Sequence, residues 1–177
     1  MRWLSLIPVL MLAQTTEEAA QALRSSRVFQ KPRYIEVIAG GRMPLNVTRP
    51  HYRVLDTLGL IQYRVESGVA EVYLTRTGEA ASRGWRLSYT GSYGDATLWH
   101  VPVATRVLLQ QVRTTGAAFQ GRADVEFSWR WQPNRIGDAL GIQKTTFSTK
   151  VALIRENGVW RVDEPGLLRG LKDSDPL

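Results

Sequence analysis

The stretch ADVEFSWRWQP, residues 123–133, alternates apolar and polar side chains with a strict period of two. Its odd positions are all apolar: Ala123, Val125, Phe127, Trp129 and Trp131. From 123 to 131, its even positions carry charged or hydroxyl groups: Asp124, Glu126, Ser128 and Arg130. Because successive side chains of a β-strand point to opposite faces, this pattern puts every aromatic ring of the stretch on one face.

A platform for stacking bases or sugars is the alternative interpretation of these aromatics. Such a platform needs rings and cations on the same solvent-facing surface, whereas the alternation separates Arg130 from Trp129 and Trp131. We therefore expect the rings in the core of an antiparallel sheet, which large buried aromatic area stabilises. Pro133 should end the strand because it has no N–H to donate.

The rest of the chain predicts helices first and strands later. Helices are expected over about 16–26 and between Thr48 and Gly59, and a hairpin from LIQYRV and AEVYLT follows them. From Trp85 the pattern becomes strand-like, and a second hairpin turns at Asn157-Gly158. The sequence thus predicts an α+β fold: a helical part over 14–84, then an antiparallel β-sheet part over 85–177 with a short C-terminal tail.

The first residues, MRWLSLIPVLMLAQTTEE, have the three regions of a secretory signal peptide. Arg2 supplies the charge, an apolar run ends at Ala13, and a polar stretch begins at Gln14. We therefore expect residues 1–13 to be a signal peptide, and the processed chain to be periplasmic or secreted. No apolar run approaches the roughly 18 residues of a spanning helix, so no transmembrane segment is expected.

The sequence offers little for catalysis. It has no cysteine, which excludes disulfides, thiolate metal sites and cysteine nucleophiles. Its only histidines are His51 and His100, and no metal-binding, nucleotide-binding or nucleophile motif surrounds them. We expect no enzyme activity, no cofactor and no metal. The alternative is a hydrolase or small-ligand protein whose pocket is lined by Tyr89, Tyr93 and His100 near the loop TGSYGD.

Positive charge is concentrated in one part of the chain. The net charge is +7 at pH 7. Residues 24–53 contain seven basic side chains and one acidic one, Glu36. The seven basic residues are the candidate anion-binding residues: Arg24, Arg27, Lys31, Arg33, Arg42, Arg49 and Arg53. This concentration favours an anionic partner; the alternative is a solvated face neutralised by carboxylates such as Asp56.

Residues 48–81, TRPHYRVLDTLGLIQYRVESGVAEVYLTRTGEAA, resemble the second half of a winged-helix domain. The likeness rests on a helix ending in LGLI, a two-stranded wing, and the turn formed by Leu74, Thr75 and Gly78. It implies that Arg49 and Arg53 face outward on a recognition helix, toward phosphates. Residues 123–162 are similar to uncharacterised exported bacterial proteins, a resemblance that implies no activity.

Export and basic charge together favour a non-catalytic binding or structural module of the bacterial cell envelope. Its partners would be anionic envelope components, contacted through the basic stretch, or another envelope protein. A cytoplasmic winged-helix DNA-binding protein is the first alternative, because nucleic acid is a partner only if the chain is not exported. A small-ligand pocket protein or hydrolase is the second.

Overall fold

The computed structural model describes residues 7–91, 95–115 and 120–175; for 7–15, 89, 90, 110, 111 and 174 it describes the backbone alone. The chain forms two compact units, each assembled from separate stretches of sequence. Unit 1 comprises Met1–Lys31, Arg106–Gln132 and Lys144–Leu177, and unit 2 comprises Pro32–Thr105 and Pro133–Gln143. The division expected at residue 84, between parts 14–84 and 85–177, stays a prediction.

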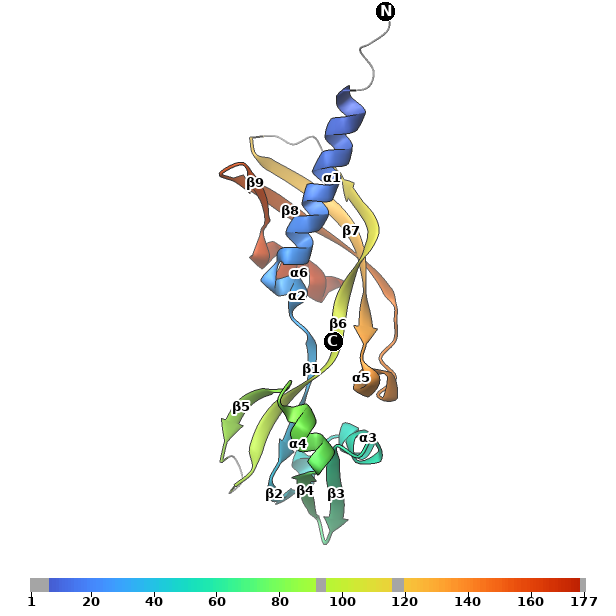
Figure 1. Cartoon of the computed structure of the whole chain (residues 1–177), viewed down its shortest axis with the longest axis vertical. Helices are drawn as coiled ribbons and strands as arrows, with labels where there is room; N and C mark the ends of the chain where they lie inside the picture. Colours follow the sequence, from blue (N-terminus) through green and yellow to red (C-terminus); the bar gives the residue numbers. More distant parts are fainter. Residues whose placement is uncertain (1–6, 92–94, 116–119, 176–177) are drawn as a thin grey trace, which may run out of the picture. The chain divides into compact units, whose positions relative to one another are not determined.

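Unit 1 is a sheet with the strand order β6-β7-β8-β9, covered by helices. Its elements are α1 (Ile7–Ser25), α2 (Arg27–Gln30), the second half of β6 (Thr97–Thr114), β7 (Arg122–Pro133), β8 (Thr146–Glu156), β9 (Val159–Val162) and α6 (Glu164–Ser174). Helix α1 packs on β9, and α6 packs on β8 (Figure 1). The pairs β7–β8 and β8–β9 are antiparallel.

Strand β7 confirms the alternation of the sequence. All its odd positions from Ala123 to Trp131 are buried, and Phe127 and Trp129 have no exposed surface. Trp129 stacks on Phe147 with ring centroids 4.7 Å apart, and its indole N–H donates to Thr149 Oγ1 at 2.9 Å. The rings therefore form the core of unit 1, and the stacking-platform interpretation is wrong for them.

Two polar side chains connect the short helix α2 to the rest of unit 1. The Glu164 carboxylate accepts the backbone N–H groups of Arg27 and Val28, both at 3.0 Å, and the Ser26 hydroxyl at 3.1 Å. Arg106 donates from Nη1 to the carbonyl oxygens of Val28 and Lys31 at 3.0 and 2.9 Å. The orphan groups at both ends of α2 thus find charged partners, as a helix of four residues requires.

Unit 2 contains two antiparallel sheets. Its elements are β1 (Arg33–Ala39), β2 (Gly41–Pro44), the 3-10 turn η1 (Leu45–Val47), α3 (His51–Thr57), β3 (Ile61–Glu66), β4 (Val69–Leu74), α4 (Arg76–Ser82), β5 (Arg86–Thr90), the first half of β6 and α5 (Arg135–Ala139). The first half of β6 pairs with β1 along one edge and with β5 along the other. The second sheet has the order β2-β4-β3.

The core of unit 2 lies between these sheets and α3. Its buried residues are Val37, Ala39, Met43, Tyr52, Leu55, Leu60, Ile61, Ala70, Val72 and Val101. The Tyr52 hydroxyl accepts the backbone N–H of Ile38 at 2.7 Å, so the one polar atom of this buried ring is satisfied. Helix α3 is thereby attached to strand β1.

The predicted fold class, α+β with a helical winged-helix-like N-terminal part, is wrong. A helix, a hairpin and a second helix do follow one another at α3, β3–β4 and α4, but both helices have only seven residues. Strand β2 adds a third strand to the hairpin, and β1 pairs with β6, far along the chain. The molecule is mostly antiparallel β-sheet, and its first part is built on strands.

The N-terminal helix α1 continues through the expected cleavage point at Ala13 to Ser25 without interruption. Its described side chains pack through Ala19, Ala20, Ala22 and Leu23, all of which are buried. Among the residues that the structure describes, no helix combines the length and apolar character needed to cross a membrane.

Candidate functional site

The seven basic residues of the predicted anion site divide between the two units. Arg24, Arg27 and Lys31 belong to unit 1, and Arg33, Arg42, Arg49 and Arg53 belong to unit 2. Carboxylates neutralise two of them: Arg24 pairs with Glu17 at 3.2 Å, and Arg42 pairs with Glu71 at 3.3 Å. The stretch that is continuous in sequence is therefore not one patch within one unit.

Arg49 and Arg53 are the two basic residues that line a common hollow in unit 2. The hollow has a volume of about 340 Å³ and is lined by Leu45, Thr48, Arg49, Pro50, Arg53 and Tyr63. Arg49 lies two residues before α3 and Arg53 lies within it, and both side chains line the hollow. The walls come from η1, α3 and β3, which carry Leu45, Arg53 and Tyr63 respectively.

No carboxylate neutralises these two arginines within the described parts of the chain. The ion pairs there are Arg24–Glu17, Arg42–Glu71, Arg122–Asp124 and Arg161–Glu156. Asp56, the expected partner of Arg53, instead accepts the backbone N–H of Tyr63 at 3.1 Å. The alternative of a face neutralised by Asp56 is thus not what the structure contains, and both guanidinium groups remain exposed.

The neighbouring titratable groups are affected by burial and by the positive charge of Arg49. Burial lowers the pKa of His51 from its ordinary value of 6.5, a hydrogen bond to the Glu36 carbonyl opposes this, and Arg49 lowers the pKa further. Burial raises the pKa of Tyr52, and the charge of Arg49 partly opposes that shift. Burial and the nearby Arg49 thus both disfavour a positive charge on His51, the residue at the start of α3.

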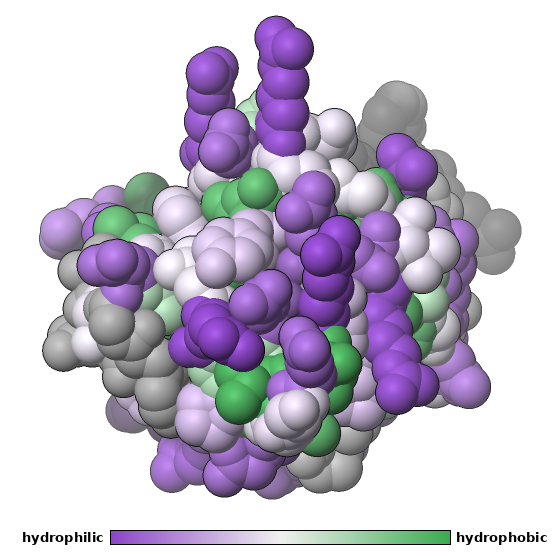
Figure 2. All heavy atoms as spheres, turned by 90° about the horizontal axis from the view of Figure 1, so that it is seen from below, coloured by the Kyte–Doolittle hydropathy of each residue, from purple (hydrophilic) through white to green (hydrophobic). Residues whose placement is uncertain are grey.

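The surface around the hollow mixes cations with apolar groups. Figure 2 shows a face on which strongly hydrophilic side chains project beside small hydrophobic areas. Leu45 in the hollow is 40% exposed, and Val65 on β3 is 49% exposed. Two hydroxyl groups complete the lining, since the Tyr63 hydroxyl donates to Thr48 Oγ1 at 3.4 Å.

The second predicted group of site residues is described only in part. Tyr93 lies outside the described residues, and of Tyr89 only the backbone in β5 is described. His100 is half-buried in β6, where its ring meets Tyr34 edge to face at 6.0 Å. The cross-strand partners of His100 are Glu36 on β1 and Arg86 on β5. A pocket lined by Tyr89, Tyr93 and His100 therefore stays a prediction.

Sequence reasoning missed four members of the unit 2 hollow: Leu45, Thr48, Pro50 and Tyr63. Tyr63 lies ten residues beyond Arg53 in a different element, and no periodicity relates the two. Thr48 was expected to cap α3, but its hydroxyl donates to the Leu45 carbonyl oxygen at 2.7 Å and α3 begins without a side-chain cap. The local turn after β2, and not a helix cap, positions Thr48 in the hollow.

Across the described residues, no group of three or more His, Asp or Glu side chains lies close enough to hold a metal ion. Comparison with family models, with curated proteins and with solved structures finds no match to this chain.

Proposed function

We propose that this protein is a non-catalytic binding module of the bacterial cell envelope, and that the Arg49–Arg53 hollow of unit 2 contacts its anionic partner. The observation that carries the proposal is the convergence on one hollow of two arginines that form no ion pair within the described residues. Guanidinium groups present several N–H donors in a fixed planar arrangement that matches phosphate and carboxylate oxygens.

The anion would lie between the two guanidinium groups, which supply the donors, because the Thr48 and Tyr63 hydroxyls already donate to the Leu45 carbonyl oxygen and to Thr48 Oγ1. Leu45 and Pro50 would contact apolar parts of the same partner. Because both arginines are exposed, their attraction for an anion is screened over about 8 Å at physiological ionic strength. Binding should therefore weaken steeply as salt is added.

Export supports the envelope as the place of this binding. The tripartite N-terminus favours secretion, and an exported module would meet anionic lipid headgroups and anionic surface polymers. The correction of the winged-helix fold removes the structural reason for a genome-binding role.

Titration of the protein against vesicles with and without phosphatidylglycerol, against heparin and against duplex DNA, at low and high salt, tests the proposal. The double reversal Arg49→Glu with Arg53→Glu should weaken binding to the preferred anion by at least about tenfold, since it replaces attraction with repulsion. Stability should change by less than about 0.5 kcal/mol per site, because both side chains are exposed.

A matched control is the double reversal of Arg76 and Arg83, two exposed residues on and just after α4 in the same unit. It changes the net charge by the same amount but leaves the hollow intact. Equal loss of binding in both double variants would mean that net charge alone attracts the anion. Binding untouched by the Arg49 and Arg53 reversals would remove the hollow from consideration.

A further inference from the structure

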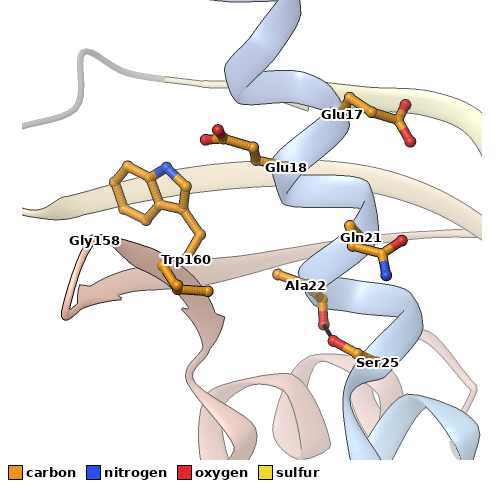
Figure 3. A pocket seen from close by; sticks show the side chains of 8 residues that line it. Glu17, Glu18, Gln21, Ala22, Ser25, Gly158 and Trp160 are labelled. Atoms are coloured by element: carbon orange, nitrogen blue, oxygen red, sulfur yellow. Dashed lines mark hydrogen bonds between the residues drawn. The ribbon is translucent and has the colours of Figure 1, made fainter.

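A second hollow lies in unit 1, between helix α1 and the β8–β9 hairpin. It has a volume of about 460 Å³, within the usual range for ligand sites. Its lining residues are Glu17, Glu18, Gln21, Ala22, Ser25, Gly158, Val159 and Trp160 (Figure 3). All of them follow Ala13, so the precursor and the processed chain both contain this hollow.

Two adjacent glutamates of α1 differ in direction and in pairing. The Glu17 carboxylate extends to the far side of the helix from Trp160 (Figure 3) and pairs with Arg24 at 3.2 Å. The Glu18 carboxylate extends toward Trp160 (Figure 3), and within the described part of the chain no cation forms an ion pair with it. Glu18 therefore offers a free acceptor over the hollow.

Trp160 supplies a donor on the opposite wall. It is only 9% exposed, yet its indole N–H forms no hydrogen bond with any described residue. In Figure 3 the indole nitrogen lies on the edge of the ring nearest Glu18. The guanidinium of Arg155 already lies 5.8 Å from the ring centroid. The nitrogen is not among the buried unpaired atoms of the described residues, so water reaches this edge of the ring, and a bound acceptor would replace that water.

Besides Glu17, Gln21 and Ser25, the remaining lining of the hollow is apolar. Ala22 is buried beneath it, and Val159 at its rim is 61% exposed. The Ser25 hydroxyl is already used, since it donates to the Ala22 carbonyl oxygen at 3.1 Å. A complementary ligand therefore needs a cation for Glu18, an acceptor for the Trp160 N–H, and an apolar stem between them.

We propose that this hollow binds a basic segment of another polypeptide, in which a Lys or Arg side chain pairs with Glu18 and a backbone carbonyl accepts the Trp160 indole N–H. A lysine residue combines the three required groups, because its ammonium group is joined to the peptide carbonyl by an aliphatic stem. A free polyamine supplies the cation but has no carbonyl acceptor. The protein itself carries a net charge of +7, so only local complementarity could attract a basic peptide.

Nuclear magnetic resonance of the ¹⁵N-labelled chain tests this at the site itself. The chain has six tryptophans, and the indole N–H signal that disappears in Trp160→Phe belongs to Trp160. Titration with the acetylated and amidated peptide Ala-Lys-Ala-Lys-Ala at low salt should shift this signal to saturation. The same peptide with Glu in place of Lys should not.

Two acidic residues of unit 1 provide matched variants, and thermal unfolding of each checks that the fold is intact. Glu18→Lys should weaken peptide binding by about tenfold, whereas Asp173→Lys, at an exposed position on α6 outside the lining of the hollow, should leave it within about twofold, although both change the charge equally. Trp160→Phe, followed through the Gly158 amide signal, should weaken binding about two- to tenfold by removing one hydrogen bond.

Three results would overturn the proposal. The first is a Trp160 signal that the lysine peptide does not move. The second is equal weakening by Glu18→Lys and Asp173→Lys, which would indicate general charge attraction. The third is spermine binding as tightly as the peptide, which would make the hollow a polyamine site with no use for the indole N–H. None of these outcomes depends on the Arg49–Arg53 hollow.

Discussion

Trp129 contributes more to unit 1 than any polar contact near it, because it combines full burial with a satisfied N–H. Replacement by Ala removes the stacking on Phe147 and the hydrogen bond to Thr149 and leaves a large cavity. We expect a loss of about 3–5 kcal/mol in the free energy of unfolding. Denaturant titration measures this.

Asp124 on the same strand is the matched control for Trp129. Its side chain is 65% exposed and lies 3.9 Å from Arg122. Asp124→Ala should change stability by less than about 0.5 kcal/mol. A loss of similar size in both variants would mean that strand β7 is needed as a whole and that burial does not distinguish its two faces.

His51 gives unit 2 a pH-dependent stability. Burial keeps its pKa below 6.5 in the folded state, so between the folded and unfolded pKa values the unfolded chain binds more protons. This contribution to stability is fully present above pH 6.5 and is lost as the pH falls through the lowered pKa. His51→Gln should reduce the fall in unfolding free energy between pH 7 and pH 5. An unchanged slope would contradict the prediction.

At the scale of elements, local sequence signals were sufficient to predict the hairpins but not the pairing of distant strands in the sheets. The turn predicted at Asn157-Gly158 is confirmed, with φ angles of 51° and 82°, because positive φ is a preference of those two residues themselves. The pairing of β1 with β6 joins stretches far apart in the sequence, and nothing local specifies it. The winged-helix interpretation failed because it considered α3, β3, β4 and α4 without the pairing of β1 with β6.

Gly78 was singled out in the sequence, but its role in the structure differs from the predicted one. It was assigned to a winged-helix turn, but in the structure α4 passes so close to Leu60 that an added Cβ would lie 1.8 Å from the Leu60 carbonyl oxygen. Gly78→Ala should therefore move α4 and destabilise unit 2 by about 1–3 kcal/mol.

Gly84, just beyond α4, is the control for Gly78. A Cβ there would meet its nearest atom, the Ala81 carbonyl oxygen, at an ordinary 3.6 Å. Gly84→Ala should be neutral or stabilise the unit by up to about 1 kcal/mol, because it reduces the freedom of the unfolded chain. Thermal unfolding of both variants should give shifts of opposite sign, and equal shifts would contradict the close-approach argument.

At the scale of the whole molecule, the candidate sites depend on placements that composition alone could not supply. The basic stretch was visible in the sequence, but the fold divides it between two units and retains only Arg49 and Arg53 in one hollow. The hollow beside Trp160 was not predicted, because Glu18 and Trp160 are brought together by the packing of α1 on β9. Non-local packing therefore determines which residues line each of the two hollows.

The proposed export makes a prediction about the whole chain. Cleavage after Ala13 would leave Gln14–Ser25 of α1, which contains the buried residues Ala19, Ala20, Ala22 and Leu23. The processed protein should therefore stay folded, with a thermal midpoint within a few degrees of the precursor's, since all the buried residues described for α1 lie after the cleavage point.

Expression in a bacterium, fractionation, and mass measurement of the intact protein test this export. We expect most of the chain in the periplasm or medium, lacking residues 1–13. Leu10→Arg, which interrupts the apolar run, should leave a full-length chain in the cytoplasm, because the signal peptide needs that run to be recognised. The matched variant Gln14→Arg, whose change lies after the apolar run, should still be exported.

If the unaltered chain remains full-length in the cytoplasm, the envelope proposal is wrong, and the anionic partner of Arg49 and Arg53 must be sought among cytoplasmic molecules.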